Sequence, residues 1–595
     1  MPCSLRRTLA LFSAFTVAVS HAAPPTMFPP VRGLREMVGA ANNQEVEAGF
    51  RILQQGGNAV DAGVAATFTA AVTEQSRFGM GGEMPVIIKM AGKPPIVISA
   101  VGVAPKKATV EFYKQRKAEP FEDSNNKPLI PPQGILSAIT PGVVDGLLLA
   151  LEEYGTMSVA QVLQPAIENA EGFPIAEEFA RMLRDFRAIH QLWPSSTAFF
   201  YPDGAPPERG TIVRMPSLAK TLRAMVETER RTRGNRRKKI EAVRALMSKG
   251  DVAKRFAAFS EANGGLITLE DLAAYRAEVD QPRTVTYRGY EIHKPGFWTQ
   301  GPVMLEALNI LEGYDLKKMG HNSPEYLHTV IEAVKLAFAD RDQHYGDPKF
   351  SKIPEAILLS KDYAAERRKL IDPKRASMES RPGQVPGGNN IAAMTSSPVQ
   401  EAPIHDTTCV NVVDAKGNAF SATPSGAWLP SVIAGDTGIP FSSRLQSFVG
   451  TPGHPNQLAP GKRPRVTLSP TMVTRNGEFV FAMSTPGGDN QDQAMLQVLL
   501  NVIDFDMSPQ EAVEAPRFQT EHFYASFAFH EFIPGKVNLE SRIPPIFIGA
   551  LEAMGHKVTV PGDWTNGSAP TLILKKDGVL HGGADPRRAR FIFGR

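Results

Sequence analysis

Thr407 is the residue in this sequence whose position is most suggestive of chemistry. It follows Asp406 and precedes a run of β-formers, residues 410–413, that ends in the turn sequence DAKGN. A threonine hydroxyl is a weak nucleophile unless a base lies nearby, and a threonine that begins a chain carries its own α-amine as that base. The plain alternative is a threonine at the start of an ordinary strand.

A free amine on Thr407 requires a cut in the peptide bond before it. In such a cut the hydroxyl attacks the carbonyl carbon of Asp406, and water then cleaves the resulting ester. We therefore predict a cleavage site between Asp406 and Thr407, with Thr407 as the nucleophile of the processed protein.

A nucleophile of this kind also needs hydrogen-bond donors for the oxyanion that forms during acyl transfer. The sequence STPGGDNQDQAM places Gly487 and Gly488 between an expected strand and an expected helix. Backbone N–H groups are unpaired at such a junction, so these glycines are candidate donors. A Gly-Gly pair is more often only a turn.

The elements around these residues change type along the chain. Residues 47–73 suggest two helices separated by a Gly-Gly-Asn turn, and residues 150–380 are mostly helical in pattern. Residues 377–406 are rich in Pro, Gly, Ser and Asn without a hydrophobic period, which favours an exposed linker. From Thr407 onward the pattern is mainly that of strands. The glycine-rich stretch 76–90 lacks the Lys-Ser/Thr of a phosphate-binding loop, so we interpret it as a loop before a strand.

Composition narrows the class of protein. The chain has 595 residues and a net charge of +4, which gives no indication of a nucleic-acid partner. A basic run at residues 229–244 is interpreted as a solvated loop and helix face. Residues 1–22 have the positive start, short apolar stretch and small residues of a secretory signal. No later segment suggests a membrane span, so we expect a protein exported to the periplasm or secreted.

The sequence contains two cysteines, Cys3 and Cys409. Cys3 leaves with the signal, so no intramolecular disulfide is expected, and Cys409 is interpreted as a buried strand thiol. Neither an HExxH sequence nor a Cys/His cluster suggests a metal, and the chemistry above needs none. We expect no metal and no cofactor.

Several motifs resemble, in their order, the γ-glutamyltransferases (γ-glutamyl transpeptidases) of the N-terminal-nucleophile (Ntn) hydrolase superfamily. The resemblance covers nearly the whole mature chain. The motifs are GGNAVDA (56–62), TPGVVDGLLLALEEYGTM (140–157), GGLITLEDLAAY (264–275), ADRDQHYGDP (339–348), TTCVNVVDAKGNA (407–419), GKRPRVTLSPTMV (461–473), STPGG (484–488) and EAVEAPRFQ (511–519).

The resemblance implies an α+β fold, the four-layer αββα sandwich of that superfamily. It implies a precursor that cuts itself before Thr407 into a large chain, residues 23–406, and a small chain, residues 407–595, which stay together. By position, Thr407 is similar to the family nucleophile, and Ser425 stands where the family has a supporting threonine. Gly487 and Gly488 match the oxyanion glycines.

The substrate pocket departs from the family pattern. Val101 stands where the family has an arginine that binds the substrate α-carboxylate, and valine cannot replace an ion pair. Other positions that would hold a glutamyl zwitterion have also changed. They are Ala427 beside Trp428, Arg444 and Ser447 in place of a glutamine and an aspartate, and Val466 and Thr467 in place of a Ser-Ser pair.

These features together predict an exported, self-processing amide hydrolase or acyltransferase. Its substrate would be a small-molecule amide or peptide with an atypical, non-glutamyl acyl group. The candidate substrate-binding residues are Arg444 or Arg465 for a carboxylate, Trp428 as an apolar wall, and Thr467. Two alternatives stay open: a true γ-glutamyltransferase (glutathione hydrolase) with a rebuilt pocket, and a non-catalytic binding protein on the same scaffold.

Overall fold

The computed structural model of the chain describes residues 26–386, 388 and 406–595. The predicted signal, residues 1–22, and most of the predicted linker, residues 377–406, lie outside the described part. Asp406 and Thr407 are described as neighbours in one continuous chain, so the geometry below is that of the uncut precursor.

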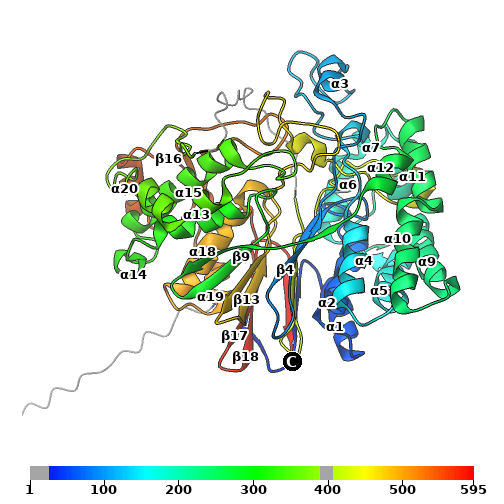
Figure 1. Cartoon of the computed structure of the whole chain (residues 1–595), viewed down its shortest axis with the longest axis horizontal. Helices are drawn as coiled ribbons and strands as arrows, with labels where there is room; N and C mark the ends of the chain where they lie inside the picture. The colour runs from blue at the N-terminus through cyan, green and yellow to red at the C-terminus, as the bar shows by residue number, and fades with distance from the viewer. Residues whose placement is uncertain (1–25, 387, 389–405) are drawn as a thin grey trace, which may run out of the picture.

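Two seven-stranded sheets form the centre of the molecule (Figure 1). Every pairing between neighbouring strands within them is antiparallel. The first sheet has the order β1 (Val31–Gly33), β18 (Val579–Ala584), β17 (Thr571–Lys576), β13 (Glu478–Ser484), β12 (Thr471–Arg475), β9 (Tyr290–Lys294) and β8 (Arg283–Tyr287). The second has the order β19 (Phe591–Gly594), β2 (Met37–Ala40), β10 (Val410–Val413), β11 (Ala419–Ala422), β3 (Met84–Lys89), β4 (Ile96–Ala100) and β7 (Glu278–Asp280).

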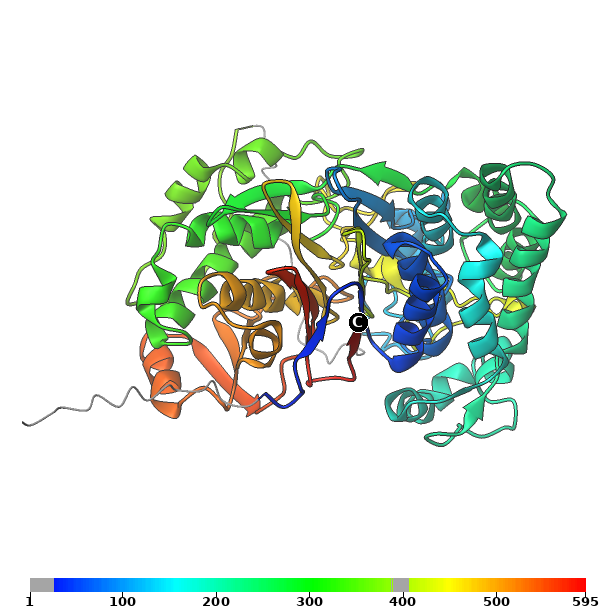
Figure 2. The same ribbon diagram turned by 90° about the horizontal axis from the view of Figure 1, so that it is seen from below.

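Helices cover the outer face of each sheet, as Figure 2 shows from below. Those against the second sheet are α1 (Asn43–Gln54), α2 (Ala59–Thr73) and α4 (Val143–Tyr154), with α5 (Val159–Glu171), α9 (Pro216–Arg231), α10 (Arg236–Ser248), α11 (Asp251–Ala262) and α12 (Leu269–Ala274) outside them. On the first sheet's side lie α13 (Pro302–Leu311), α15 (Pro324–His344), α18 (Gln491–Ile503), α19 (Pro509–Glu514) and α20 (Pro545–Ala553). The sequence of layers is helix, sheet, sheet, helix, which confirms the predicted αββα sandwich.

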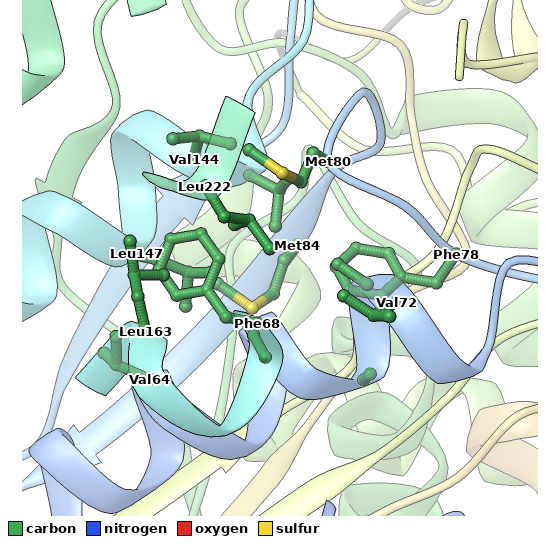
Figure 3. Close-up of a cluster of buried hydrophobic side chains, with 14 of the residues drawn as sticks. Val64, Phe68, Val72, Phe78, Met80, Met84, Val144, Leu147, Leu163 and Leu222 are labelled. Carbon is green, nitrogen blue, oxygen red and sulfur yellow. The ribbon is translucent and has the colours of Figure 1, made fainter. Parts of the chain in front are cut away.

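Three apolar clusters hold these layers together. One lies between the second sheet and its helices, where Phe68, Met84 and Leu147 are buried (Figure 3). Another lies between the first sheet and α13, α15 and α18. A third, which includes Val413 and Ile573, fills the space between the sheets. Both sheets are therefore buried on both faces, and the alternation of polar and apolar residues in their central strands is suppressed.

Local sequence signals explain how the helices begin. The Gly-Gly-Asn turn separates α1 from α2, as predicted, and Asn58 caps α2 in a reciprocal box with Asp61. Asp61 also accepts hydrogen bonds from the backbone of Thr156 and Met157, so it joins the start of α2 to the start of α5. The GGNAVDA motif is thus a structural joint between helices.

Residues 150–380 are mostly helical, as predicted. The remaining short elements of this region are α6 (Glu177–Asp185), α7 (Arg187–His190), α8 (Pro194–Phe200), α14 (Leu316–Met319), α16 (Glu355–Leu358) and α17 (Lys361–Arg368), with β5 (Phe173–Pro174) and β6 (Ile212–Val213), and α3 (Val110–Gln115) precedes it. The basic run, residues 229–244, spans the end of α9 and most of α10. Arg230 and Arg231 are exposed there, whereas Arg244 is buried and paired with Asp145.

A candidate active site at one end of the two sheets

Thr407 and Ser425 meet because they extend one hairpin. Strands β10 and β11 pair with Val410 opposite Ala422, and the same register continues to an isolated bridge between Thr407 and Ser425. Their hydroxyl oxygens lie 3.0 Å apart, and both residues are buried. A spacing of 18 residues in sequence is therefore a direct cross-strand pair in space. The structure brings together the predicted nucleophile and its predicted support.

The carbonyl group of Asp406 faces two side-chain donors. Ser425 Oγ donates to this carbonyl oxygen at 2.9 Å, and the indole Nε1–H of Trp428 makes a short hydrogen bond to the same atom. Trp428 Nε1 also lies 3.0 Å from Ser425 Oγ. The carbonyl that Thr407 would attack is thus surrounded by donors.

The side chain of Asp406 is held in place by two arginines. Arg77, just after α2, and Arg588, near the C-terminus, both form ion pairs with Oδ2 of Asp406. Its other carboxylate oxygen accepts the backbone N–H of Thr407 at 2.8 Å. Burial lowers the pKa of Arg588 to about 9, and the nearby charge of Arg77 acts in the same direction. Asp406 is therefore held by two residues that lie more than 180 positions away in sequence, one on each side of the cut.

Gly487 and Gly488 form a tight turn between β13 and α18, as predicted. Gly487 has φ +120°, and a Cβ atom at this position would lie 2.2 Å from Oγ of Ser568, so no other residue fits without a shift. Within the described residues, the backbone N–H groups of both glycines donate no hydrogen bond. Both donors are available to an oxyanion.

The start of α18 points at the same place. Gln491, its first residue, lies with Nε2 3.5 Å from Thr407 Oγ1. The partial positive charge at a helix N-terminus favours developing negative charge nearby. A buried pair of Lys294 and Asp492, 2.8 Å apart, anchors this turn of the helix to the end of β9.

A network of charged side chains holds Asp489, the residue that follows the glycine turn. Arg341, fully buried in α15, donates to Asp489 at 2.5 Å and to Asp342 at 2.7 Å. Asp489 follows Gly488 directly and also accepts from Ser526. Arg341 therefore pairs with its neighbour Asp342 and also fixes the glycine turn through Asp489, which is 148 residues away in sequence.

Arg444 lies beside the aromatic side of the site. Its Nε is 2.5 Å from Glu83 Oε1, and both residues are fully buried. Its guanidinium lies 4.4 Å from the ring centre of Trp428 and 5.6 Å from that of Phe527. Burial lowers the pKa of Arg444 and raises that of Glu83, while the attraction between the two charges opposes both shifts. Gly426, at φ +105°, makes room for Glu83, because a Cβ there would lie 2.0 Å from Glu83 Oε2.

The two candidate carboxylate-binding arginines differ in their surroundings. Both Nη atoms of Arg444 are buried without a hydrogen-bond partner among the described residues. Arg465 instead donates through Nη1 to the carbonyl of Arg341 at 3.0 Å and lies 3.7 Å from Asp342. Burial lowers the pKa of Arg465 to about 10. Arg465 therefore belongs to the network behind the glycine turn.

The remaining predicted positions are buried around the same end of the sheets. The hydroxyl of Thr467 and that of Ser447 have no partner in the described part of the chain. Val101 belongs to the apolar cluster between the sheets. Cys409 is buried with its sulfur 3.6 Å from Thr571 Oγ1, and burial raises its pKa, which suits a packing role.

A cleft of about 230 Å³ opens onto the glycine turn. Gly487 and Gly488 lie at one end, and Phe523, Phe527 and Ile533 provide an apolar wall. Acidic side chains, among them Glu521 and Glu531, line other parts of it. The cleft therefore offers access to the glycine N–H groups for a substrate with an apolar portion.

One group of described residues has a composition suited to a metal. His328, Glu332 and His556 place one ligand atom each within 4.8 Å of one another. Glu332, however, is paired with Lys335 at 2.7 Å and Arg381 at 3.0 Å, and the two histidines bond each other at 2.8 Å. These cations occupy the carboxylate and repel a metal ion, so the group is a hydrogen-bonded network.

Comparison with known proteins places this geometry in a family. The model of the family Gamma-glutamyltranspeptidase matches residues 46–594. The glutathione hydrolase proenzyme of Escherichia coli (strain K12) is 32% identical, with 98% of each chain covered. The acylase ACY 1 proenzyme of Pseudomonas sp. (strain SE83) is 34% identical, over 93% of this chain and 92% of that protein.

Solved structures agree. A crystal structure of cephalosporin acylase from Bacillus halodurans superposes with a TM-score of 0.82 and 29% identity, covering 97% of this chain and 98% of that one. The αββα sandwich and these relatives define an amidohydrolase of the Ntn class. Within that class, the chain belongs to the gamma-glutamyltranspeptidase family.

The described residues include no helix that combines the length and apolar character needed to cross a membrane.

Proposed function

We propose that the protein is an exported precursor that cuts itself before Thr407, and that the processed enzyme uses Thr407 to hydrolyse amides of a carboxylate-bearing, non-glutamyl acyl group. In the processed form the α-amine of Thr407 takes the proton of its own hydroxyl. The hydroxyl then attacks the substrate carbonyl, the amine product leaves, and water or a second amine resolves the acyl-enzyme.

The nucleophile assignment is supported by the pairing of Thr407 with Ser425 and by the glycine turn. A hydrogen bond of 3.0 Å between the hydroxyl groups orients the attacking oxygen. Gly487 and Gly488 then supply two N–H donors for the substrate oxyanion, close to the positive end of α18. No metal enters this scheme, because the amine serves as the base.

One observation supports the proposed acyl specificity: the two Nη atoms of Arg444 are buried and have no hydrogen-bond partner among the described residues. A buried, charged donor without a partner is costly, and a carboxylate of the substrate would remove that cost with two charge-assisted hydrogen bonds. Trp428 and Phe527 flank the guanidinium and would pack against the methylene groups of a glutaryl-type chain. Arg465 is less suited to this role, because it is engaged with Asp342 and the backbone of Arg341.

An ordinary glutathione hydrolase is the second candidate, and the full-length relative from Escherichia coli favours it. The hydroxyls of Thr467 and Ser447, which have no hydrogen-bond partner among the described residues, could bind polar groups of a glutamyl zwitterion. Against it stands Val101, which replaces the arginine expected to bind the α-carboxylate, and Ser447, which replaces an acid expected to bind the ammonium.

Three p-nitroanilides separate these candidates: glutaryl, γ-glutamyl and valeryl. The glutaryl substrate should have the highest kcat/KM. Substituting both members of the buried pair, Glu83→Leu with Arg444→Met, should lower kcat/KM for glutaryl by at least about 10²-fold, given two hydrogen bonds of about 1.5–3 kcal/mol each to a charged group. The valeryl value should change less than about threefold, since that chain has no carboxylate.

The assays are run on fully processed protein, so that slower cleavage of a variant does not lower the amount of active enzyme. Arg465→Gln is the matched control, and it should lower the glutaryl and valeryl values by similar factors. Preference for γ-glutamyl-p-nitroanilide, with inhibition by free glutamate, would overturn the proposed acyl specificity in favour of the second candidate.

A further inference from the structure

We infer that self-cleavage uses an oxyanion site of its own, made by Trp428 Nε1–H and Ser425 Oγ–H, and that this site is separate from the glycine turn that serves substrate turnover. The inference deepens the proposed function and rests on it, because it concerns the cut that exposes the amine of Thr407. It gives Trp428 a hydrogen-bond donor role in the uncut chain, in addition to the apolar wall proposed for the processed enzyme.

The first argument is the position of the two donors. An oxyanion donor should lie about 2.7–3.1 Å from the position that the oxyanion will occupy, and donors already bonded to the carbonyl oxygen stand beside the atom on which that charge develops. Ser425 Oγ lies 2.9 Å from the carbonyl oxygen of Asp406, and the indole N–H of Trp428 bonds the same atom. Both donors are buried, where water cannot weaken them.

The second argument is that the glycine turn does not take part in the uncut chain. Within the described residues, neither Gly487 nor Gly488 donates to the carbonyl of Asp406. The N–H groups of the turn thus stay available while another set of donors holds the carbonyl that is to be cut. Self-cleavage and substrate turnover, which both use the hydroxyl of Thr407, would thus rely on different oxyanion donors.

The third argument is the support behind Trp428. The guanidinium of Arg444 lies 4.4 Å from the centre of its ring, a distance typical of cation–π contacts. A cation over an indole face withdraws electron density and strengthens the N–H as a donor. The backbone of Glu83, the partner of Arg444, exchanges two hydrogen bonds of 3.0 Å with the backbone of Ser425. Glu83 therefore helps to position both donors, Ser425 directly and Trp428 through Arg444.

The step itself balances without any added reactant. A bond forms between Thr407 Oγ1 and the carbonyl carbon of Asp406, the peptide C–N bond breaks, and the proton of the hydroxyl moves to the nitrogen of Thr407. Asp406 Oδ1, 2.8 Å from that nitrogen, accepts a hydrogen bond from the amine that is released. Water then hydrolyses the ester, leaving a carboxylate on Asp406 and a free hydroxyl on Thr407.

Pulse labelling of the full-length precursor tests the inference, with the rate of conversion into two chains as the readout. Trp428→Phe keeps a ring and removes the N–H, and should slow cleavage about 10²–10³-fold, the effect of losing one oxyanion donor. Phe527→Leu is the matched control, since Phe527 packs against Trp428 but has no donor, and it should cleave within about threefold of the parent rate. Ser425→Ala should also cleave slowly, and Ser425→Thr should restore most of the rate.

Two measurements separate a donor role from a structural one. In a Thr407→Ala background, Trp428→Phe should leave the Tm within a few degrees. Once cleavage of the Trp428→Phe protein is complete, its kcat should fall by a much smaller factor than its cleavage rate, because the glycines stabilise the substrate oxyanion. If Trp428→Phe lowers the Tm sharply, its cleavage rate no longer tests the donor role. The cleavage rates of Ser425→Ala and Ser425→Thr then provide the test.

Cleavage of Trp428→Phe at the parent rate overturns the inference, and so does equal cleavage of Ser425→Ala and Ser425→Thr. An equal loss of cleavage rate and kcat in Trp428→Phe also overturns it, because one shared site would then serve both reactions. A Thr407→Ala precursor that is still cut before residue 407 would instead overturn the proposed function, so the two failures are distinguishable.

Discussion

The buried ion pair of Glu83 and Arg444 allows a quantitative prediction of stability. Both side chains are fully buried, with Oε1 and Nε 2.5 Å apart. Glu83→Gln preserves the shape but leaves the charge of Arg444 without a carboxylate. Removing one partner of a buried pair costs about 3–5 kcal/mol, because the remaining charge stays desolvated.

The expected change in melting temperature follows from the size of the chain. For 595 residues, an unfolding entropy of about 2.1 cal/mol/K per residue gives roughly 1.2 kcal/mol/K, so this loss lowers Tm by about 2–4 °C. Replacing both partners, Glu83→Leu with Arg444→Met, should return Tm to within about 1 °C of the parent, since apolar replacement of a buried pair is often neutral.

Calorimetry on uncut precursors measures this effect, and a Thr407→Ala background keeps every sample in one chain. The matched control is Asp185→Asn, which breaks a pair with Arg181 of 2.8 Å that is about half exposed. Such a surface pair contributes about 0–1 kcal/mol, so Tm should fall by less than about 1 °C. A Tm for Glu83→Gln equal to that of Asp185→Asn would refute the reasoning that the buried charge dominates.

Three further outcomes are expected. Gly487→Ala should lower kcat by at least about tenfold, because a Cβ at φ +120° meets Ser568 and shifts the turn, while the rate of self-cleavage stays at the parent level; a parallel loss of both would count against separate donors. Burial lowers the pKa of His190 from 6.5 to about 3, so between these pH values the unfolded chain binds a proton at this residue and the folded protein does not. The free energy of unfolding therefore falls by about 1.36 kcal/mol per pH unit as the pH is lowered from 6.5 to about 3. In urea unfolding at pH 6.5, 5.5 and 4.5, His190→Gln should reduce the slope by that amount, and an unchanged slope would contradict it. Finally, iodoacetamide should leave buried Cys409 unmodified in native protein, as read by intact mass; rapid stoichiometric alkylation would show that the thiol is accessible.

Much of the fold follows from local signals in the sequence. The β-formers at residues 410–413 do form β10, and Asn58 does begin a helix after the Gly-Gly turn. Ser425 was assigned as the support of Thr407 from the family resemblance, and the register of the β10–β11 hairpin explains why the two residues are in contact. The Gly487–Gly488 turn was identified from its position between a strand and a helix.

The supporting residues could not be predicted in the same way, because their partners are distant in sequence. Glu83 and Arg444 are 361 residues apart, and Arg341 and Asp489 are 148 apart. The charge of Glu83, directly before the five apolar residues 84–88 of β3, was a signal, since a buried carboxylate needs a partner. The sequence held no comparable indication that Arg77 and Arg588 would meet at Asp406.

The central claim is that Thr407 cuts the bond before it and then serves as the nucleophile, and intact-mass measurement of the parent and of Thr407→Ala tests it most directly. The account predicts two chains for the parent, one starting near residue 23 and ending at Asp406, and one starting at Thr407, while Thr407→Ala remains a single chain. A parent that stays whole, or a Thr407→Ala protein that is cut at the same bond, would contradict it.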